Sequence, residues 1–154
     1  MNKGSTLFLK LVILLIGIAV AALCVFVLPA GITSDETGAY RPILIGMYIP
    51  AIPFFFGLHQ AFKLLTYIDL NKVFSTESVK ALKNIKYCAS LICLMYTLGM
   101  PYIFYVADMD DAPGVAVIGF IFIFGSLVIA AAAAVFQRLI QNVVDIKSEN
   151  DLTV

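Results

Sequence analysis

The chain has 154 residues, no net formal charge, 62% apolar residues, only 13% charged residues and a mean hydropathy of +1.00. A soluble domain is typically about 45–50% apolar and about 25% charged, and so few charged side chains cannot cover its surface. The composition excludes an ordinary cytosolic enzyme, a disordered chain and a nucleic-acid reader with a broad basic face. It indicates an integral membrane protein, which has the lipid bilayer as its first partner and makes no direct contact with nucleic acid.

Four segments are long enough to cross a membrane as helices, because about 20 apolar residues span a hydrocarbon core of about 30 Å. Lipid admits only helices and closed barrels, and the alternating ten-residue segments of a barrel are absent. We therefore predict an all-α fold, a polytopic four-transmembrane-helix bundle with helices that extend into the cytoplasm. A single membrane domain covers residues 1–154, with spans at about 7–28, 43–67, 87–107 and 115–139.

Lys3 and Lys10 precede the apolar run of the first span, which ends before Pro29. Its apolar run, residues 11–28, exceeds the apolar core of a signal peptide, which is about 7–15 residues long. A small-x-small cleavage site is also missing. The pattern predicts a first transmembrane helix that is retained.

The second span contains Pro50 and Pro53, and each proline removes a backbone donor and disfavours a straight helix. We expect a kink near residues 47–51, which is either purely structural or part of a ligand or gating site. His59 and Lys63 are four residues apart and share a helix face. Lys63 can extend to the headgroups, whereas His59 is either neutral and bonded to a neighbouring helix or a proton-relay or ligand group. The candidate ligand-binding residues are Pro50, Pro53, His59 and Lys63.

The connection over residues 68–86 has the features of a helix start. Ser75 or Thr76 can cap the helix, and Glu77 lies in its first turn near the positive end of the dipole. We predict that this helix continues into the third span, and that a turn precedes it at residues 69–71.

The fourth span also continues past the membrane, because polar and apolar residues alternate at helical spacing up to about Lys147. The two extended helix ends either pack on each other or form a docking surface for a cytoplasmic partner or anionic lipid. Small residues in the first and fourth spans fit either a compact bundle or a homo-oligomer seam. The candidate partner-binding residues are Lys72, Phe74, Glu77, Lys80, Lys83, Glu149, Asp151 and Leu152.

The basic residues indicate the orientation. Nine of the ten lysines and arginines lie on the side of the termini and the 68–86 connection, and only Arg41 lies on the other. By the positive-inside rule, both termini and this connection face the cytoplasm.

The motifs of known enzymes are absent. The sequence has no HExxH, GxSxG, P-loop or GxGxxG, and one histidine with three scattered cysteines does not give the spacing of a metal site. We predict a protein that is not an enzyme and has no catalytic residues, metal site or cofactor.

Two stretches carry a family resemblance. Residues 68–83 (IDLNKVFSTESVKALK) and 149–154 (ENDLTV), combined with four spans in about 150 residues, resemble the bacterial membrane family called domain of unknown function 2975. The resemblance implies a multi-pass protein of the bacterial cell membrane. It also implies a small helix-turn-helix regulator as partner, because such regulators are often encoded beside members of the family.

Two functions therefore stay open. The first is a regulatory or scaffold protein that binds such a regulator at its cytoplasmic face. The second is a small-molecule or lipid-binding, channel or transporter-like protein that acts through the kinked second span.

Overall fold

The computed structural model describes residues 3–36 and 38–152. All regular structure in these ranges is helical, and four helices are long and apolar enough to cross a membrane, over Gly4–Thr33, Gly38–Asp69, Thr76–Met109 and Pro113–Leu152. The predicted all-α membrane fold with four spans is confirmed.

The first span is interrupted by a wide helical turn. It consists of α1 (Lys3–Ala22), the π-helical turn η1 (Leu23–Val27) and α2 (Leu28–Thr33). The N–H of Leu28 bonds to the carbonyl of Leu23, five residues back. Pro29 follows directly and has no N–H for the carbonyl four residues before it, so the widened turn accommodates the proline ring.

The second span is broken where the kink was predicted. It consists of η2 (Gly38–Tyr40), α3 (Arg41–Gly46) and α4 (Tyr48–Asp69), with a break at Met47. Pro50 cannot bond to the carbonyl of Gly46, and its ring would collide with that carbonyl in a continuous helix. The helix is interrupted within the range where a kink or locally unwound turn was predicted, whereas Pro53 lies inside α4 without ending it.

The last two helices are long and continuous. Helix α5 (Thr76–Met109) begins at Ser75, whose side chain accepts a hydrogen bond from the N–H of Ser78, as predicted for the cap. Helix α6 (Pro113–Leu152) has 40 residues and is roughly 60 Å long, about twice the hydrocarbon core. Both helices are longer than the about 20 residues that cross a hydrocarbon core, as predicted.

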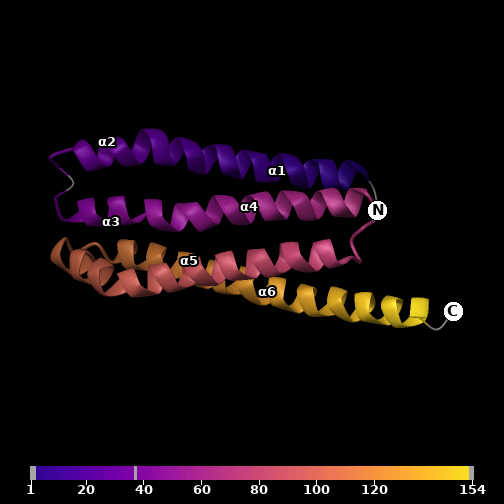
Figure 1. Cartoon of the computed structure of the whole chain (residues 1–154). Helices are drawn as coiled ribbons and strands as arrows, with labels where there is room; N and C mark the ends of the chain where they lie inside the picture. Colours follow the sequence, from indigo (N-terminus) through magenta and orange to yellow (C-terminus); the bar gives the residue numbers. More distant parts are fainter. Residues whose placement is uncertain (1–2, 37, 153–154) are drawn as a thin grey trace.

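The four spans form two antiparallel hairpins, α1 with α4 and α5 with α6. The main helix contacts follow the chain, with α1 on α4, α4 on α5 and α5 on α6. The start of α1 and the end of α6 lie at one end of the molecule, together with the end of α4 and the start of α5 (Figure 1). We call this the basic end, because it carries Lys10, Lys63, Lys72, Lys80, Lys83, Lys86, Arg138 and Lys147.

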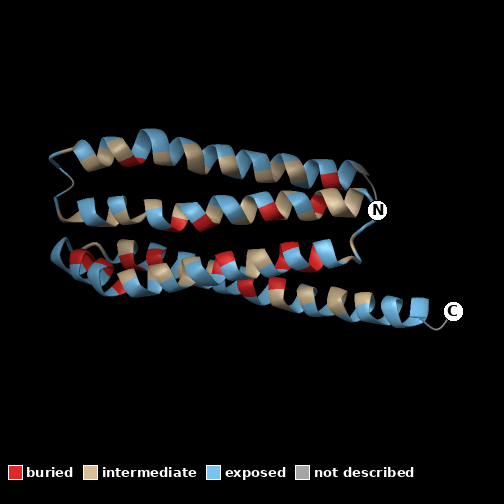
Figure 2. Ribbon diagram, viewed as in Figure 1, coloured by how far each residue is buried: buried red, intermediate tan, exposed pale blue. Residues whose placement is uncertain are grey.

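Burial differs strongly between the helices (Figure 2). In the described first span only Thr6 and Leu28 are buried, whereas α5 has ten buried residues. Many large apolar side chains of all four spans are exposed, as expected for helices that contact lipid. Helix α5 is therefore the centre of the packing, and α1 is peripheral.

Candidate functional site

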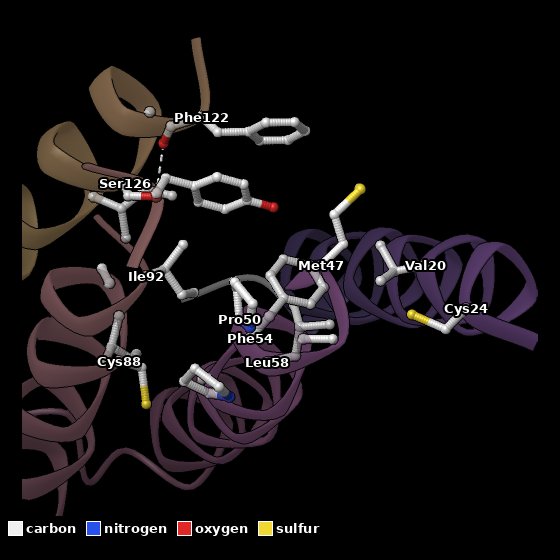
Figure 3. A pocket seen from close by; sticks show the side chains of 18 of the residues that line it. Val20, Cys24, Met47, Pro50, Phe54, Leu58, Cys88, Ile92, Phe122 and Ser126 are labelled. Atoms are coloured by element: carbon white, nitrogen blue, oxygen red, sulfur yellow. Dashed lines mark hydrogen bonds between the residues drawn. The ribbon is translucent and has the colours of Figure 1, made fainter. Parts of the chain in front are cut away.

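An apolar cavity of about 560 Å³ lies between the four spans. Its walls come from residues 20–28 of the first span, 47–61 of the second span, 85–96 of α5 and 121–129 of α6. Figure 3 shows side chains from all of these segments directed toward the space. Its volume falls within the about 300–1,000 Å³ of small-molecule sites, so this is the first candidate for a binding site.

Interrupted helices and small residues create the space. Pro50 and Pro53 are buried in its wall, directly after the break at Met47. Gly57, Ala61, Ala89 and Gly125 leave room where larger side chains would project. A Cβ added at Gly125 would meet no atom within 4 Å, so this position faces open space.

The polar groups in the wall are largely used by the protein itself. The Ser126 hydroxyl donates to the carbonyl of Phe122 at 2.8 Å, and the carbonyl of Cys24 accepts from the Tyr48 hydroxyl at 2.7 Å. Tyr96 brings a further hydroxyl, and its ring stacks on Phe122 with centroids 5.1 Å apart. The wall is therefore hydrocarbon with very few polar positions.

The structure separates the four candidate ligand-binding residues into two pairs. Pro50 and Pro53 line the cavity, whereas His59 and Lys63 are exposed and lie outside its wall. At 100° per residue, positions 50, 53, 54, 57 and 61 share one side of α4, and 59 and 63 lie on another. His59 and Lys63 do share a face, but it is not the face of the cavity.

Polar contacts fasten α1 to α4 at the basic end. Lys10 Nζ lies 2.8 Å from Asp69 Oδ2, and the hydroxyl of the buried Thr6 donates to Oδ1 of the same carboxylate. The Lys10 ammonium also lies 5.3 Å from the ring centroid of Phe62. A lysine and an aspartate at the ends of consecutive spans are the sequence signal for this pair, which our sequence analysis did not identify.

A second polar contact links α4 to α5. Gln60, only 6% exposed, accepts a hydrogen bond from the side chain of Asn84 at 3.3 Å. In hydrocarbon, a buried amide needs such a partner. Gln60 therefore has a packing role, next to the exposed His59.

The candidate partner-binding residues lie on the surface of the basic end. All eight are exposed, five before or within the start of α5 and three at the end of α6: Lys72, Phe74, Glu77, Lys80, Lys83, Glu149, Asp151 and Leu152. The pKa of Glu77 is lowered from 4.5, first by a hydrogen bond from its own backbone N–H and then by the Ser75 hydroxyl. The start of α5 is thus a capped and ordered surface.

The two projecting helix ends differ in packing. The start of α5 buries Ser78, Val79, Ala81 and Leu82, whereas Ala133 is the last buried residue of α6 in the described range. Every residue from Asp145 to Leu152 is exposed. The end of α6 therefore projects from the molecule, and the alternative that the two helix ends pack on each other does not hold for residues 145–152.

A small polar hollow lies at the level where α6 leaves the bundle. It has a volume of about 200 Å³ and is lined by Lys86, Ala134, Val135, Gln137 and Arg138. The buried Oε1 of Gln137 has no hydrogen-bond partner among the described residues. No group of three or more metal-ligating side chains occurs in the described part of the chain.

Comparisons with known proteins extend the resemblance noted in the sequence. The model of the family described as "Protein of unknown function (DUF2975)" matches residues 29–154. The chain is 52% identical, over 162 aligned positions and 100% of both chains, to the "Uncharacterized membrane protein YoaS" of Bacillus subtilis (strain 168). No solved structure matches the chain. With four apolar helices of spanning length and this match, the chain is a membrane protein that belongs to the DUF2975 family.

Proposed function

We propose that this protein is a non-enzymatic membrane protein of regulatory or scaffold type, whose basic end binds a small soluble helix-turn-helix regulator. The observation that carries the proposal is the projecting end of α6. From Asp145 to Leu152 every residue is exposed, at the end that also presents Lys72, Lys80 and Lys83. A helix that extends this far beyond its packing partners presents surface to another molecule.

The charge distribution supports a cytoplasmic position of this surface. In the described chain, eight basic side chains lie at the basic end and Arg41 at the other. This asymmetry favours a multi-pass arrangement in a bacterial cell membrane with both termini in the cytoplasm. A cytoplasmic regulator then meets the end of α6 and the start of α5 together.

The end of α6 has the chemistry that a DNA-binding domain would contact. Asp145, Glu149 and Asp151 outnumber Lys147 there, which makes this segment acidic. A helix-turn-helix domain carries a basic face for DNA phosphates, and an acidic helix complements that face. The exposed Leu139, Val143 and Ile146 recur at spacings of four and three, which adds an apolar stripe for helix contact.

Binding of a helix-turn-helix regulator, of the kind often encoded beside members of the family, would test the proposal. The full chain in nanodiscs is compared with the triple variant Asp145→Asn, Glu149→Gln, Asp151→Asn. We expect about tenfold weaker binding and a smaller salt dependence, because three charge contacts are removed. The matched control is Asp35→Asn with Glu36→Gln at the opposite end, which leaves binding unchanged. Equal affinity of the triple variant and the wild type would contradict the proposal.

A second candidate is a small-molecule or lipid-binding, channel or transporter-like protein that acts through α4. The observation that favours it is the cavity, whose wall contains Pro50 and Pro53. Its test is solute flux in proteoliposomes with Pro50→Ala, which removes the proline that follows the break at Met47 and reshapes the wall. We expect flux to fall with this variant and to persist with His59→Ala, because His59 lies outside the wall.

A further inference from the structure

We infer that the cavity holds one acyl chain of a membrane phospholipid, which reaches it sideways through a gap between α1 and α6. The inference uses the same cavity as the second candidate function and rests on it to that extent. It names the class of molecule that is bound, and it does not require that the protein transports a solute. Four observations carry it: the shape of the cavity, the chemistry of its wall, the position of its opening and the burial of its floor.

The shape fits a single extended chain. The wall runs along the second span from Met47 to Ala61 and along α5 from Ile85 to Tyr96, which are lengths of roughly 21 Å and 16 Å. One leaflet of a bilayer core is about 15 Å thick, so the long axis follows the direction of a lipid tail. A volume of 560 Å³ over this length gives a mean cross-section of roughly 27 Å². A helix with side chains is about 10–12 Å across and does not fit.

The chemistry of the wall selects hydrocarbon over water. A buried water needs two to four polar partners. The Ser126 hydroxyl and the Cys24 carbonyl are already engaged within the protein, and the Tyr96 hydroxyl is one further group. An empty space would leave the wall without dispersion contacts on one side. A lipid tail from the surrounding bilayer supplies those contacts.

The opening faces the bilayer. All four spans line the cavity, but α1 packs on α4 and not to any substantial extent on α6 in the described ranges. Figure 3 shows Val20 and Cys24 of the first span on one side of the space and Phe122 and Ser126 of α6 on the other. Phe122 lines the cavity and is nevertheless 43% exposed. The α1–α6 side is therefore the route for a tail.

The floor of the cavity distinguishes a bound chain from lipid on the outer surface. Cys88 and Ala89 line the space, yet they are only 9% and 5% exposed. Lipid around the outside of the protein cannot reach these two residues. Contact between a tail and residues 88–89 is therefore specific for a chain inside the cavity.

Photocrosslinking tests the inference. The full chain is placed in phosphatidylethanolamine–phosphatidylglycerol nanodiscs that contain a trace of phosphatidylglycerol with a diazirine in the middle of one acyl chain. After illumination, labelled peptides are located by mass spectrometry. We expect labels at Cys88–Ala89 in addition to the outer faces of the spans. Labels confined to the outer faces would overturn the inference.

A cavity-filling variant with a matched control makes the test specific. At Gly125, which lines the cavity, and at Gly99, which does not, an added Cβ meets no atom within 4 Å. We expect Gly125→Phe to reduce labelling at residues 88–89 about tenfold or more, because its ring replaces several methylenes of the bound chain. Gly99→Phe leaves the labelling unchanged. Undiminished labelling in Gly125→Phe, with a thermal unfolding curve like that of the wild type, overturns the inference, and Ser126→Phe repeats the test if Gly125→Phe does not fold.

Further measurements separate this inference from the proposed functions. Extraction of the purified protein should yield one tightly held phospholipid per chain, and an isoprenoid in its place would overturn the assignment to a phospholipid. If residues 88–89 are labelled but no solute flux is seen, the transporter function is contradicted and the bound acyl chain is supported. If residues 88–89 are not labelled but the regulator binds normally, the bound acyl chain is contradicted and the regulatory role is retained.

Discussion

The two hairpins of this protein are held together in different ways. Helices α5 and α6 approach so closely that a Cβ at Gly119 would come within 2.7 Å of the sulfur of Met100. The first span and α4 bury little, and polar contacts join them at both ends, from Lys10 of α1 to Asp69 and from Tyr48 to the carbonyl of Cys24 in η1. In lipid the hydrophobic effect does not drive helices together, so close packing and hydrogen bonds carry the association. The α5–α6 hairpin is held mainly by close packing, and the hairpin of the first span and α4 mainly by polar contacts.

The largest expected effect comes from breaking the packed hairpin. In Gly119→Leu the new side chain meets Met100 and Ile103, both buried, so these side chains or the two helices must shift to make room for it. We expect a loss of about 1–3 kcal/mol in stability, measured by thermal unfolding in detergent. Gly114→Leu on the same helix meets open space and serves as the control. Equal melting curves for the two variants would contradict close packing at Gly119.

The next effect comes from breaking the polar contact of the other hairpin. Asp69→Ala removes the carboxylate that Lys10 and Thr6 contact. The Lys10 side chain is only 20% exposed, and Thr6 is buried. Because Lys10 and Asp69 are partly solvated, we expect a coupling of about 1 kcal/mol in a double-mutant cycle with Lys10→Met. Asp145→Ala on the exposed end of α6 is the control, with an expected change near zero. A coupling near zero for the Lys10–Asp69 pair would show that the contact does not hold α1.

A smaller effect is expected at the opposite end of the same hairpin. Tyr48→Phe removes the hydrogen bond to the carbonyl of Cys24, which lies in the π-helical turn. Interhelical hydrogen bonds in membranes contribute about 0.6 kcal/mol on average, so the melting temperature should fall slightly. The exposed Tyr105→Phe is the control and should have no effect. If the melting temperature falls more in Tyr105→Phe than in Tyr48→Phe, the hydrogen bond from Tyr48 to η1 does not stabilise the hairpin.

The smallest effect concerns the start of α5 and depends on pH. The pKa of Glu77 is lowered from 4.5 in the folded protein, so its stabilising contribution is complete above that value and is lost as pH falls through the folded-state pKa. Hydrogen exchange of the amides at residues 77–80 should accelerate, relative to intrinsic rates, as pH falls below 4.5. Glu77→Gln should remove this dependence. An unchanged pH dependence in the variant would show that another group controls the start of the helix.

Several local features could be predicted because each depends on a few neighbouring residues. The Ser75 cap follows from a hydroxyl three residues before an N–H at a helix start, and the break near Met47 follows from Pro50. The π-helical turn before Pro29 was not predicted, although a proline inside an apolar run is its signal. The cavity could not be predicted, because its wall combines segments of four helices far apart in the chain.

The sequence by itself determined that the chain enters a membrane as four helices, since apolar length and missing charge are properties of continuous segments. Only the tertiary structure decided which face of each helix meets another helix. That arrangement placed Pro50 and Pro53 in a cavity, left His59 and Lys63 outside it and paired Lys10 with Asp69. Lipid and protein interior are equally apolar, so hydropathy does not distinguish a lipid-facing side chain from a packed one, and helix contacts depend on shape and on polar partners.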